Sequence, residues 1–205
     1  MKEEEQQEQN QFEGLIQGLI DDTYGCCNDF VMPSTVNGLR DNSTRLSAEG
    51  NMKNAGIGNK KDFQKDNLYR SDKINWIDEQ STNSFEAIYL KKIWKFIEHL
   101  NKTCFTSIKS FESHYSVFEK GSFYKKHLDQ FKNENGRKYS IVLYLNHDWK
   151  DEDEGLLSLY PLGKEQKNFA PLGGRMVFFK SDEMEHEVNP SSSRERRSIA
   201  GWLKS

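Results

Sequence analysis

The sequence is poor in cysteine, and the cysteines present suggest neither a metal site nor a disulfide framework. There are three in 205 residues, Cys26, Cys27 and Cys104. Adjacent cysteines rarely bridge each other, and an odd number argues against a secreted disulfide scaffold. Their spacing matches no cysteine metal-binding motif. We therefore expect a protein of a reducing compartment, most simply the cytoplasm.

Long apolar runs and a strong charge of one sign are also missing. No stretch approaches the ~20 apolar residues that cross a bilayer. The N-terminal MKEEEQQEQNQ lacks the basic start and apolar core of a secretory signal. A net charge of -3 gives no general basic field for nucleic acid or anionic lipid. These features predict a soluble protein with no membrane or nucleic-acid partner.

The sequence does contain enough apolar and aromatic surface for one domain. Hydrophobic residues make up 35% of the chain and aromatic residues 12%, so large rings should supply much of the buried area. A chain of this length fits a single domain with a sizeable core. We expect residues 1–10 to form a flexible, solvated lead-in and residues 11–205 the single domain.

Helical periodicity dominates the first half of the chain. Apolar residues recur at helical spacing over 12–20, and Pro33 opens a polar helix after a short strand over 24–32. The clearest helix is predicted over 85–100, where Asn83 precedes it as a cap.

Glu86, three residues after Asn83, completes the spacing of a capping box at the start of that helix. The segment 48–68 is rich in glycine, asparagine and lysine without periodicity, and a loop this long in a compact domain is usually functional or mobile. Its Gly56 and Gly58 lack the third glycine and the acidic residue of a dinucleotide fingerprint. Residues 69–77 are predicted to be extended.

Beyond residue 105 the pattern changes to strands. Apolar and polar residues alternate, and glycine, asparagine and serine clusters separate the runs. Strands are predicted over 113–117, 140–145, 156–160, 175–179, 184–188 and 196–203, with turns at 133–136, 151–155, 172–174 and 189–191. Helices followed by many short strands predict a mixed α/β (α+β) fold, in which a helical layer supports an antiparallel jelly roll.

The most informative residues are His127 and Asp129, at the end of an aromatic, extended stretch. Residues two apart on a strand point to the same face, so both side chains can reach one ion. His186, from a later strand, would complete a face of two histidines and one carboxylate. That ligand set leaves metal positions open and is typical of non-haem Fe(II) oxygenases.

Arg196 follows ten residues after His186. Strand parity puts it on one face with Ser198, Ala200 and Trp202. If this face lines the barrel, a buried guanidinium requires a carboxylate, from the protein or from a ligand. The small neighbours leave room for a ligand, and the arginine fork suits a dicarboxylate.

Other polar residues have simpler interpretations. A single histidine is more often a surface or core residue than a ligand, and we assign His99, His114 and His147 to that class. The acidic run 151–154 is typical of a solvated hairpin tip, although it could bind a cation. Residues 194–197 could contact phosphate, but a partly exposed strand end fits a protein of negative net charge better.

The motifs around these residues resemble the 2-oxoglutarate- and Fe(II)-dependent oxygenases, specifically the prolyl 4-hydroxylase family. The matching segments are GSFYKKHLD, YSIVLYLNHDW, EGLLSLYP, GGRMVFF, HEVNP and RRSIAGW. Upstream, YRSDKINWI at 69–77 is similar to the hypoxia-type prolyl hydroxylases and their bacterial relatives. The resemblance covers roughly residues 24 to 204 and implies a double-stranded β-helix, or cupin-like jelly roll.

The resemblance also implies roles for particular residues. Iron would be held by three ligands, and Arg196 would complete the catalytic set by binding the distal carboxylate of 2-oxoglutarate. The implied metal ligands are His127, Asp129 and His186. The implied cosubstrate contacts are Arg196, the Tyr144 hydroxyl, Leu157, Trp202 and the position of Phe118. The implied substrate contacts are Asp72, Tyr124 and Arg137, with segment 48–68 as a mobile lid.

Three departures from the family pattern stand out. Phe118 occupies a place where relatives commonly carry a tyrosine that donates a hydrogen bond near the cosubstrate. That donor is lost unless Tyr115 or water replaces it. Glu154 and Gly155 stand where a Gly-Gly hairpin is usual, a change we expect to be tolerated. The spacing from His186 to Arg196 is one residue longer than in the hypoxia branch, which an extra turn residue in 191–193 can absorb.

By resemblance, the chain is a dioxygenase that hydroxylates a prolyl residue of a protein or peptide and releases succinate and CO2. It would use Fe(II), 2-oxoglutarate and O2, with ascorbate as a reductant, and act as a monomer. Two alternatives remain open: the same chemistry on another side chain or a small molecule, and a catalytically silent binding module on this fold.

Overall fold

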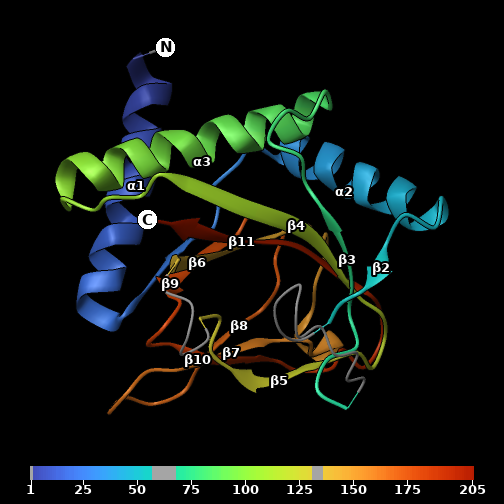
Figure 1. Cartoon of the computed structure of the whole chain (residues 1–205). Coiled ribbons are helices and arrows are strands. Elements are labelled where there is room, and N and C mark those ends of the chain that lie inside the picture. The colour runs from blue at the N-terminus through green and yellow to red at the C-terminus, as the bar shows by residue number, and fades with distance from the viewer. Residues whose placement is uncertain (1, 57–67, 131–135) are drawn as a thin grey trace.

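The computed structural model describes residues 2–56, 68–130 and 136–205. Three helices lie on one side of a large antiparallel sheet, and a second, smaller sheet lies on the other side (Figure 1). The helices are α1 (Lys2–Asp22), α2 (Pro33–Ala48) and α3 (Ser84–Thr103), with a short 3-10 turn η1 (Asp151–Asp153). The predicted helical layer over an antiparallel jelly roll is confirmed.

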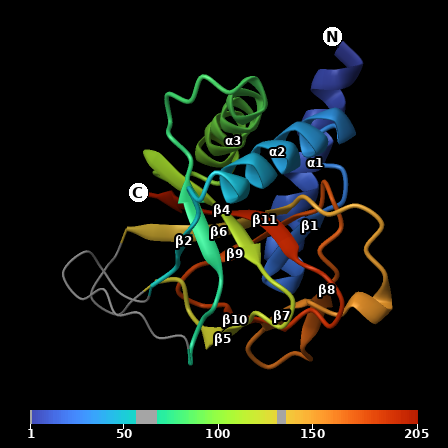
Figure 2. The same cartoon turned by 90° about the vertical axis from the view of Figure 1, so that its right-hand side faces the viewer.

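The larger sheet has the strand order β1-β9-β6-β11-β4-β3-β2. Its strands are β1 (Tyr24–Cys27), β2 (Lys53–Asn54), β3 (Lys73–Trp76), β4 (Ser110–Phe118), β6 (Arg137–Tyr144), β9 (Met176–Lys180) and β11 (Arg196–Lys204). The smaller sheet has the order β5-β10-β7-β8. Its strands are β5 (Tyr124–His127), β7 (Leu157–Tyr160), β8 (Lys167–Phe169) and β10 (Glu185–Val188). Figure 2 shows the two sheets stacked below the helices.

Two apolar clusters follow these layers. The first fills the space between the helices and the large sheet and includes the buried face of α3, from Tyr89 to Leu100. The second, around Tyr144, Leu159 and Phe179, lies between the sheets. Gly38 on α2 lets Phe85 of α3 approach so closely that an added Cβ would lie 2.2 Å from its ring. Gly38 thus allows close packing of α2 against α3 within the helical layer. The candidate site lies on the other side of the large sheet, between the two sheets.

The caps of the helices are partly as predicted. The side chain of Asn83 accepts hydrogen bonds from the backbone N–H groups of Phe85 and Glu86, and so caps α3. Glu86 does not complete the capping box. Its buried carboxylate accepts from Asn42, at 2.6 Å, and from the hydroxyl of Tyr115, at 3.0 Å. A tertiary contact replaces the local one.

Several boundaries differ from prediction. Helix α1 begins at Lys2, so residues 2–10 are helical and not an irregular lead-in. The carboxylate of Glu8 lies 2.6 Å from the ammonium group of Lys95 on α3, and this ion pair holds the first part of α1 against α3. Strand β1 ends at Cys27, because Phe30 turns into the core. Strand β8 was not predicted, since KNF shows no alternation.

Parts of two predicted loops lie outside the described residues. Segment 48–68 contains β2, but its residues 57–67 are not described, and neither are residues 133–135 of the predicted turn at 133–136. Among the described residues, no helix is both long and apolar enough to cross a bilayer.

Candidate metal centre and its cavity

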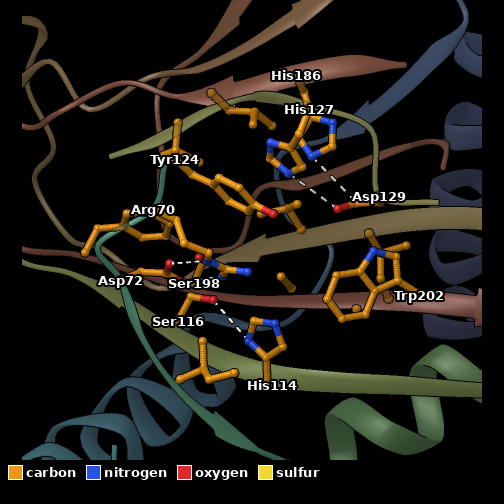
Figure 3. Close-up of a pocket in the computed structure, with 18 of the residues that line it drawn as sticks. Arg70, Asp72, His114, Ser116, Tyr124, His127, Asp129, His186, Ser198 and Trp202 are labelled. Atoms are coloured by element: carbon orange, nitrogen blue, oxygen red, sulfur yellow. Dashed lines mark hydrogen bonds and ion pairs between the residues drawn. The ribbon is translucent and has the colours of Figure 1, made fainter. Parts of the chain in front are cut away.

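Three potential metal ligands converge between the sheets. His127 ends β5 and pairs directly with His186 on β10, and Asp129 follows two residues later. Nε2 of His127 lies 3.5 Å from Oδ1 of Asp129, and Nε2 of His186 lies 3.5 Å from Oδ2 of the same carboxylate. All the potential ligand atoms lie within 4.8 Å of one another (Figure 3). One divalent ion can therefore reach all three side chains.

Backbone contacts fix the orientation of both imidazoles. Nδ1 of His127 lies 2.7 Å from the carbonyl oxygen of Lys125, and Nδ1 of His186 lies 3.0 Å from that of Met184. A carbonyl only accepts, so the ring protons belong on Nδ1 and the Nε2 lone pairs face the cluster. Such outer contacts set the tautomer and hold the ring of a metal-binding histidine.

The charges of the cluster also suit a cation. Burial lowers the pKa of His186 to about 4, with the neighbouring His127 adding to the effect and Asp129 opposing it. Burial disfavours the charged form of Asp129, but the imidazoles of His186 and His127 and the hydroxyl of Ser140 outweigh it and hold its pKa below the usual range. Near neutral pH the site offers a neutral imidazole and a carboxylate, the forms that bind metals.

A cavity of about 530 Å³ opens beside this cluster. The metal-ligand residues lie on one side of it, and β4 and β11 form the other (Figure 3). The cavity is lined by Phe118, Leu157, Arg196 and Trp202, which were predicted to contact the cosubstrate, and by Asp72, Tyr124 and Arg137, which were predicted to contact the substrate. The structure thus brings these predicted residues together around one cavity.

Arg196 is the most unusual residue of the cavity. It is 1% exposed, and its guanidinium carbon lies 5.0 Å from the ring centroids of both Phe118 and Tyr144. No carboxylate pairs with it within the described parts of the chain, and its Nε and the Tyr144 hydroxyl are buried without hydrogen-bond partners there. An unpaired buried cation is costly. The arrangement therefore fits an anionic ligand.

The predicted substrate-contacting residues already have partners in the protein. Both carboxylate oxygens of Asp72 accept from Arg70, each at 2.7 Å, and the Arg70 guanidinium lies 4.2 Å from the Tyr124 ring centroid. The Tyr124 ring stacks on His127 at 3.5 Å. These contacts link the cavity wall to a metal-ligand residue.

Arg137 is held in a similar way on the opposite wall. It donates to Glu112 at 2.8 Å, and its guanidinium carbon lies 3.6 Å from the ring centroid of Trp202. Trp202 also approaches Trp76, at 6.2 Å between ring centroids. Arg137 thus shapes the mouth of the cavity.

Tyr115 does not replace the hydroxyl that Phe118 lacks. Tyr115 lies on the other face of β4, where its hydroxyl bonds Glu86 in the helical-layer core. The suggestion that Tyr115 could supply the missing hydroxyl is therefore wrong.

Glu154 stands in the hairpin where the family pattern has Gly-Gly. It adopts φ 56° and ψ -131°, a backbone conformation that favours glycine.

Sequence reasoning missed several residues of the cavity. His114, placed among ordinary core or surface histidines, lines the cavity with Glu112 and Ser116. The signal was available: these residues occupy the even positions of β4, the same face as Phe118. Arg70 was missed because, within this segment, only its partner Asp72 was matched to a substrate-contacting position of the family.

Comparison with known proteins agrees with this geometry. Residues 113–204 match the family model of the 2OG-Fe(II) oxygenase superfamily. The chain is 29% identical over 192 residues to human Egl nine homolog 1, covering 87% of this chain and 43% of that protein. It thus spans about half the length of the Egl nine homologs it matches.

Two solved structures have the same fold. A Pseudomonas putida prolyl-4-hydroxylase is 29% identical, with a TM-score of 0.85 over 94% of this chain and 98% of that one. A Trichoplax adhaerens prolyl hydroxylase, solved with a hypoxia inducible factor peptide, is 23% identical, with a TM-score of 0.90 over 100% of this chain and 93% of that one. The likeness thus extends over nearly the whole length of both chains.

The fold, the ligand cluster and the match over residues 113–204 all agree with the 2OG-Fe(II) oxygenase superfamily. Within it, the chain is similar to the prolyl hydroxylases, as the sequence motifs indicated. The residues present fit the metal and cosubstrate of that superfamily. Two imidazoles and a carboxylate suit Fe(II), and the unpaired Arg196 suits the far carboxylate of 2-oxoglutarate.

Proposed function

We propose that this protein is an Fe(II)- and 2-oxoglutarate-dependent dioxygenase that hydroxylates a prolyl residue of a protein or peptide at its 4-position, releasing succinate and CO2. One observation carries the proposal. A cluster of His127, Asp129 and His186 shares a single cavity with a buried arginine that has no carboxylate partner among the described residues.

The roles of the metal-facing residues follow from their contacts. When bound, the iron supplies the oxygen-activating chemistry, on a protein face that leaves coordination positions open. His127 and His186 present Nε2 because their Nδ1 atoms are tied to backbone carbonyls. Ser140 donates to Asp129 at 2.7 Å and holds that carboxylate. These residues bind and orient, and none has to act as a general acid or base.

The cosubstrate end of the cavity is built by β4, β6, β7 and β11. Arg196 would bind the distal carboxylate of 2-oxoglutarate with two parallel N–H donors. The Tyr144 hydroxyl, without another partner among the described residues, would donate to the same carboxylate. Leu157 and Phe118 would exclude water from the reacting atoms at this end, and Trp202, which packs against Trp76, would close the cavity toward its mouth.

A prolyl substrate is supported by the mouth of the cavity and by the relatives. Trp76 is 52% exposed beside Trp202 and Arg137, which gives flat apolar surface for a proline ring. The Pseudomonas putida relative is a prolyl-4-hydroxylase, and the Trichoplax enzyme was solved with a peptide. The Arg70–Asp72 pair would position the peptide at this mouth.

Further parts of the proposal concern the setting. Cys26, Cys27 and Cys104 are unpaired, which supports a reducing compartment such as the cytoplasm. We also propose that the protein acts as a monomer, without a nucleic-acid or membrane partner, and that ascorbate can keep the iron reduced.

The test is coupled turnover. Purified protein with Fe(II), 2-oxoglutarate and ascorbate is offered a library of proline-containing peptides, and succinate is measured together with an added oxygen mass on proline. We expect one succinate for each hydroxyproline, and loss of both in His127→Ala. Hydroxylation of another residue, or no succinate with any peptide, would contradict the proposal.

A further inference from the structure

His114 lines the cavity toward its mouth and has no role in the proposed chemistry. It pairs with Ala200 of β11 and with Trp76 of β3. It is 2% exposed, and its ring centroid lies 5.0 Å from that of Trp76 and 5.4 Å from that of Trp202. In Figure 3 the imidazole rises from β4 toward the cavity, opposite the metal-ligand residues. Its place in the mouth is therefore fixed by two indoles.

The contacts of the ring leave one nitrogen available. Nδ1 lies 3.1 Å from the carbonyl oxygen of Tyr115 and 3.1 Å from the Ser116 hydroxyl. Because a carbonyl only accepts, the ring proton belongs on Nδ1. Nε2 is then a bare acceptor. No described residue donates a hydrogen bond to it.

The charged groups around His114 keep it in this state. Arg70 is engaged by Asp72, and Arg137 by Glu112, so neither guanidinium turns to the imidazole. Burial, with the positive charge of Arg70 and against the negative charge of Asp72, lowers the pKa of His114 to about 4. Near neutral pH the imidazole is neutral, and its Nε2 can only accept a hydrogen bond.

Strand register separates His114 from the cosubstrate end. Arg196 pairs with Phe118, four residues along β4 from His114. At the rise of a strand these positions are about 13 Å apart, whereas a five-carbon diacid spans only ~5 Å between its end carbons. His114 also lies beside Trp76, which is half exposed at the mouth. His114 is thus out of reach of a carboxylate held by Arg196, and its contacts with Trp76 and Trp202 place it toward the mouth, where a substrate enters.

We propose that His114 is a substrate-binding residue whose Nε2 accepts a hydrogen bond from a backbone N–H of the bound peptide. The inference rests on the proposed function and narrows its substrate class. Proline itself has no N–H, so the donor comes from a neighbouring residue. The preferred substrate is then a proline flanked by residues that carry N–H groups, and a continuous proline tract is a poor one.

The experiment compares His114→Phe, which keeps a ring and removes the acceptor, with His114→Gln, which restores an acceptor at its side-chain oxygen. His147→Phe is the matched control, since His147 lies outside the cavity. The probe is the peptide that gives the highest coupled turnover in the library. Its backbone-ester analogues each replace one N–H with oxygen, and melting temperatures check folding.

We expect His114→Phe to raise the peptide KM by about three- to tenfold, the effect of one hydrogen bond. The KM for 2-oxoglutarate should stay within about twofold. His114→Gln should recover part of the loss. One ester analogue should weaken binding to the wild type by the same factor, measured by anisotropy with Mn(II) and oxalylglycine, and not weaken binding to His114→Phe.

Three outcomes would overturn the inference while the proposed function stands: an unchanged peptide KM in His114→Phe, a rise confined to the KM for 2-oxoglutarate, or an ester effect that is the same in both proteins. The inference would also be overturned if a continuous proline tract were turned over as fast as the flanked proline. If the wild type turns over no proline peptide, the proposed function and this inference fail together.

Discussion

Arg196 and Arg197 are neighbours in the chain but have opposite environments. Arg197 faces the helices, where Glu195, Ser43 and Ser47 accept from it. Arg196 faces the inter-sheet cavity and has no carboxylate partner in the described parts of the chain. Alternation along a strand predicted that the two side chains face opposite sides. The partly exposed strand end expected at 194–197 is wrong for both, because Arg196 is 1% and Arg197 4% exposed. The ion pair of Arg70 with Asp72 is local, but the stacking of Arg70 on Tyr124 was not predictable, because it depends on a bridge between two distant segments.

This contrast predicts opposite effects for the same substitution at two adjacent positions. Arg196→Met removes an unpaired buried charge, so we expect an equal or higher melting temperature. It also removes the guanidinium that binds the carboxylate, so the binding free energy of 2-oxoglutarate should weaken by about 2–5 kcal/mol. Arg197→Met, the control, should lower stability and leave that affinity nearly unchanged. Calorimetry and thermal unfolding measure both. A 2-oxoglutarate affinity that survives in Arg196→Met would contradict the assignment.

Phe118 leads to a second prediction at this scale. Its ring lines the cavity beside Arg196 but carries no hydroxyl. Phe118→Tyr should add a donor to the cosubstrate, worth about 0.5–1.5 kcal/mol, and lower the KM for 2-oxoglutarate by at least about twofold. Tyr115→Phe is the matched control, because Tyr115 bonds Glu86 on the other face. It should change stability alone. A KM that does not fall in Phe118→Tyr would show that the hydroxyl is not needed.

At the scale of elements, periodicity predicted every helix and most strands, and the failures have tertiary causes. Helix α1 continues to Lys2, with Glu8 reaching Lys95 on α3. Strand β8 is held by its pairing with β7 and has no pattern of its own. In each case a partner outside the element decides, and the pattern of the element itself does not reveal it.

The hairpin at Glu154 gives the prediction that belongs to this scale. Glu154 adopts φ 56° and ψ -131°, which a side chain with a Cβ rarely does. Glu154→Gly should relieve about 1 kcal/mol of strain and raise the melting temperature by about 2–4 °C. Glu152→Gly is the control, since Glu152 lies in η1 without a positive φ, and it should not stabilise. A lower melting temperature in Glu154→Gly would contradict the strained backbone.

At the scale of the whole molecule, the metal cluster connects the two sheets. His127 and His186 belong to the small sheet, and Asp129 bonds Ser140 of the large one. The sequence motif predicted which residues meet. It could not predict the width of the cavity, which is set by the packing of the two sheets around the second apolar cluster.

This arrangement predicts how stability depends on pH. His186 and His114 have pKa values near 4 when folded, against about 6.5 in an unfolded chain. The unfolded state therefore binds more protons between these values, and the metal-free protein should lose stability as pH falls from 6.5 toward 4. Asp129, with its depressed pKa, adds a loss below about pH 4.

The stabilisation by a bound metal ion should depend on the same protonation steps. At 100 times its dissociation constant, Mn(II) should stabilise the protein by about 2.7 kcal/mol at pH 7. The stabilisation should shrink at pH 5, because protons compete for the imidazoles. Thermal unfolding with and without Mn(II) at several pH values measures both effects. A melting temperature that is flat from pH 7 to 4.5, or a Mn(II) effect independent of pH, would contradict this account.

The most direct measurement is a crystal structure with Mn(II) and oxalylglycine bound. We expect one ion bonded to Nε2 of His127, Nε2 of His186 and the Asp129 carboxylate, at about 2.0–2.3 Å. The far carboxylate of oxalylglycine should meet the guanidinium of Arg196. An ion that contacts only two of these side chains, or a carboxylate bound away from Arg196, would contradict the oxygenase site.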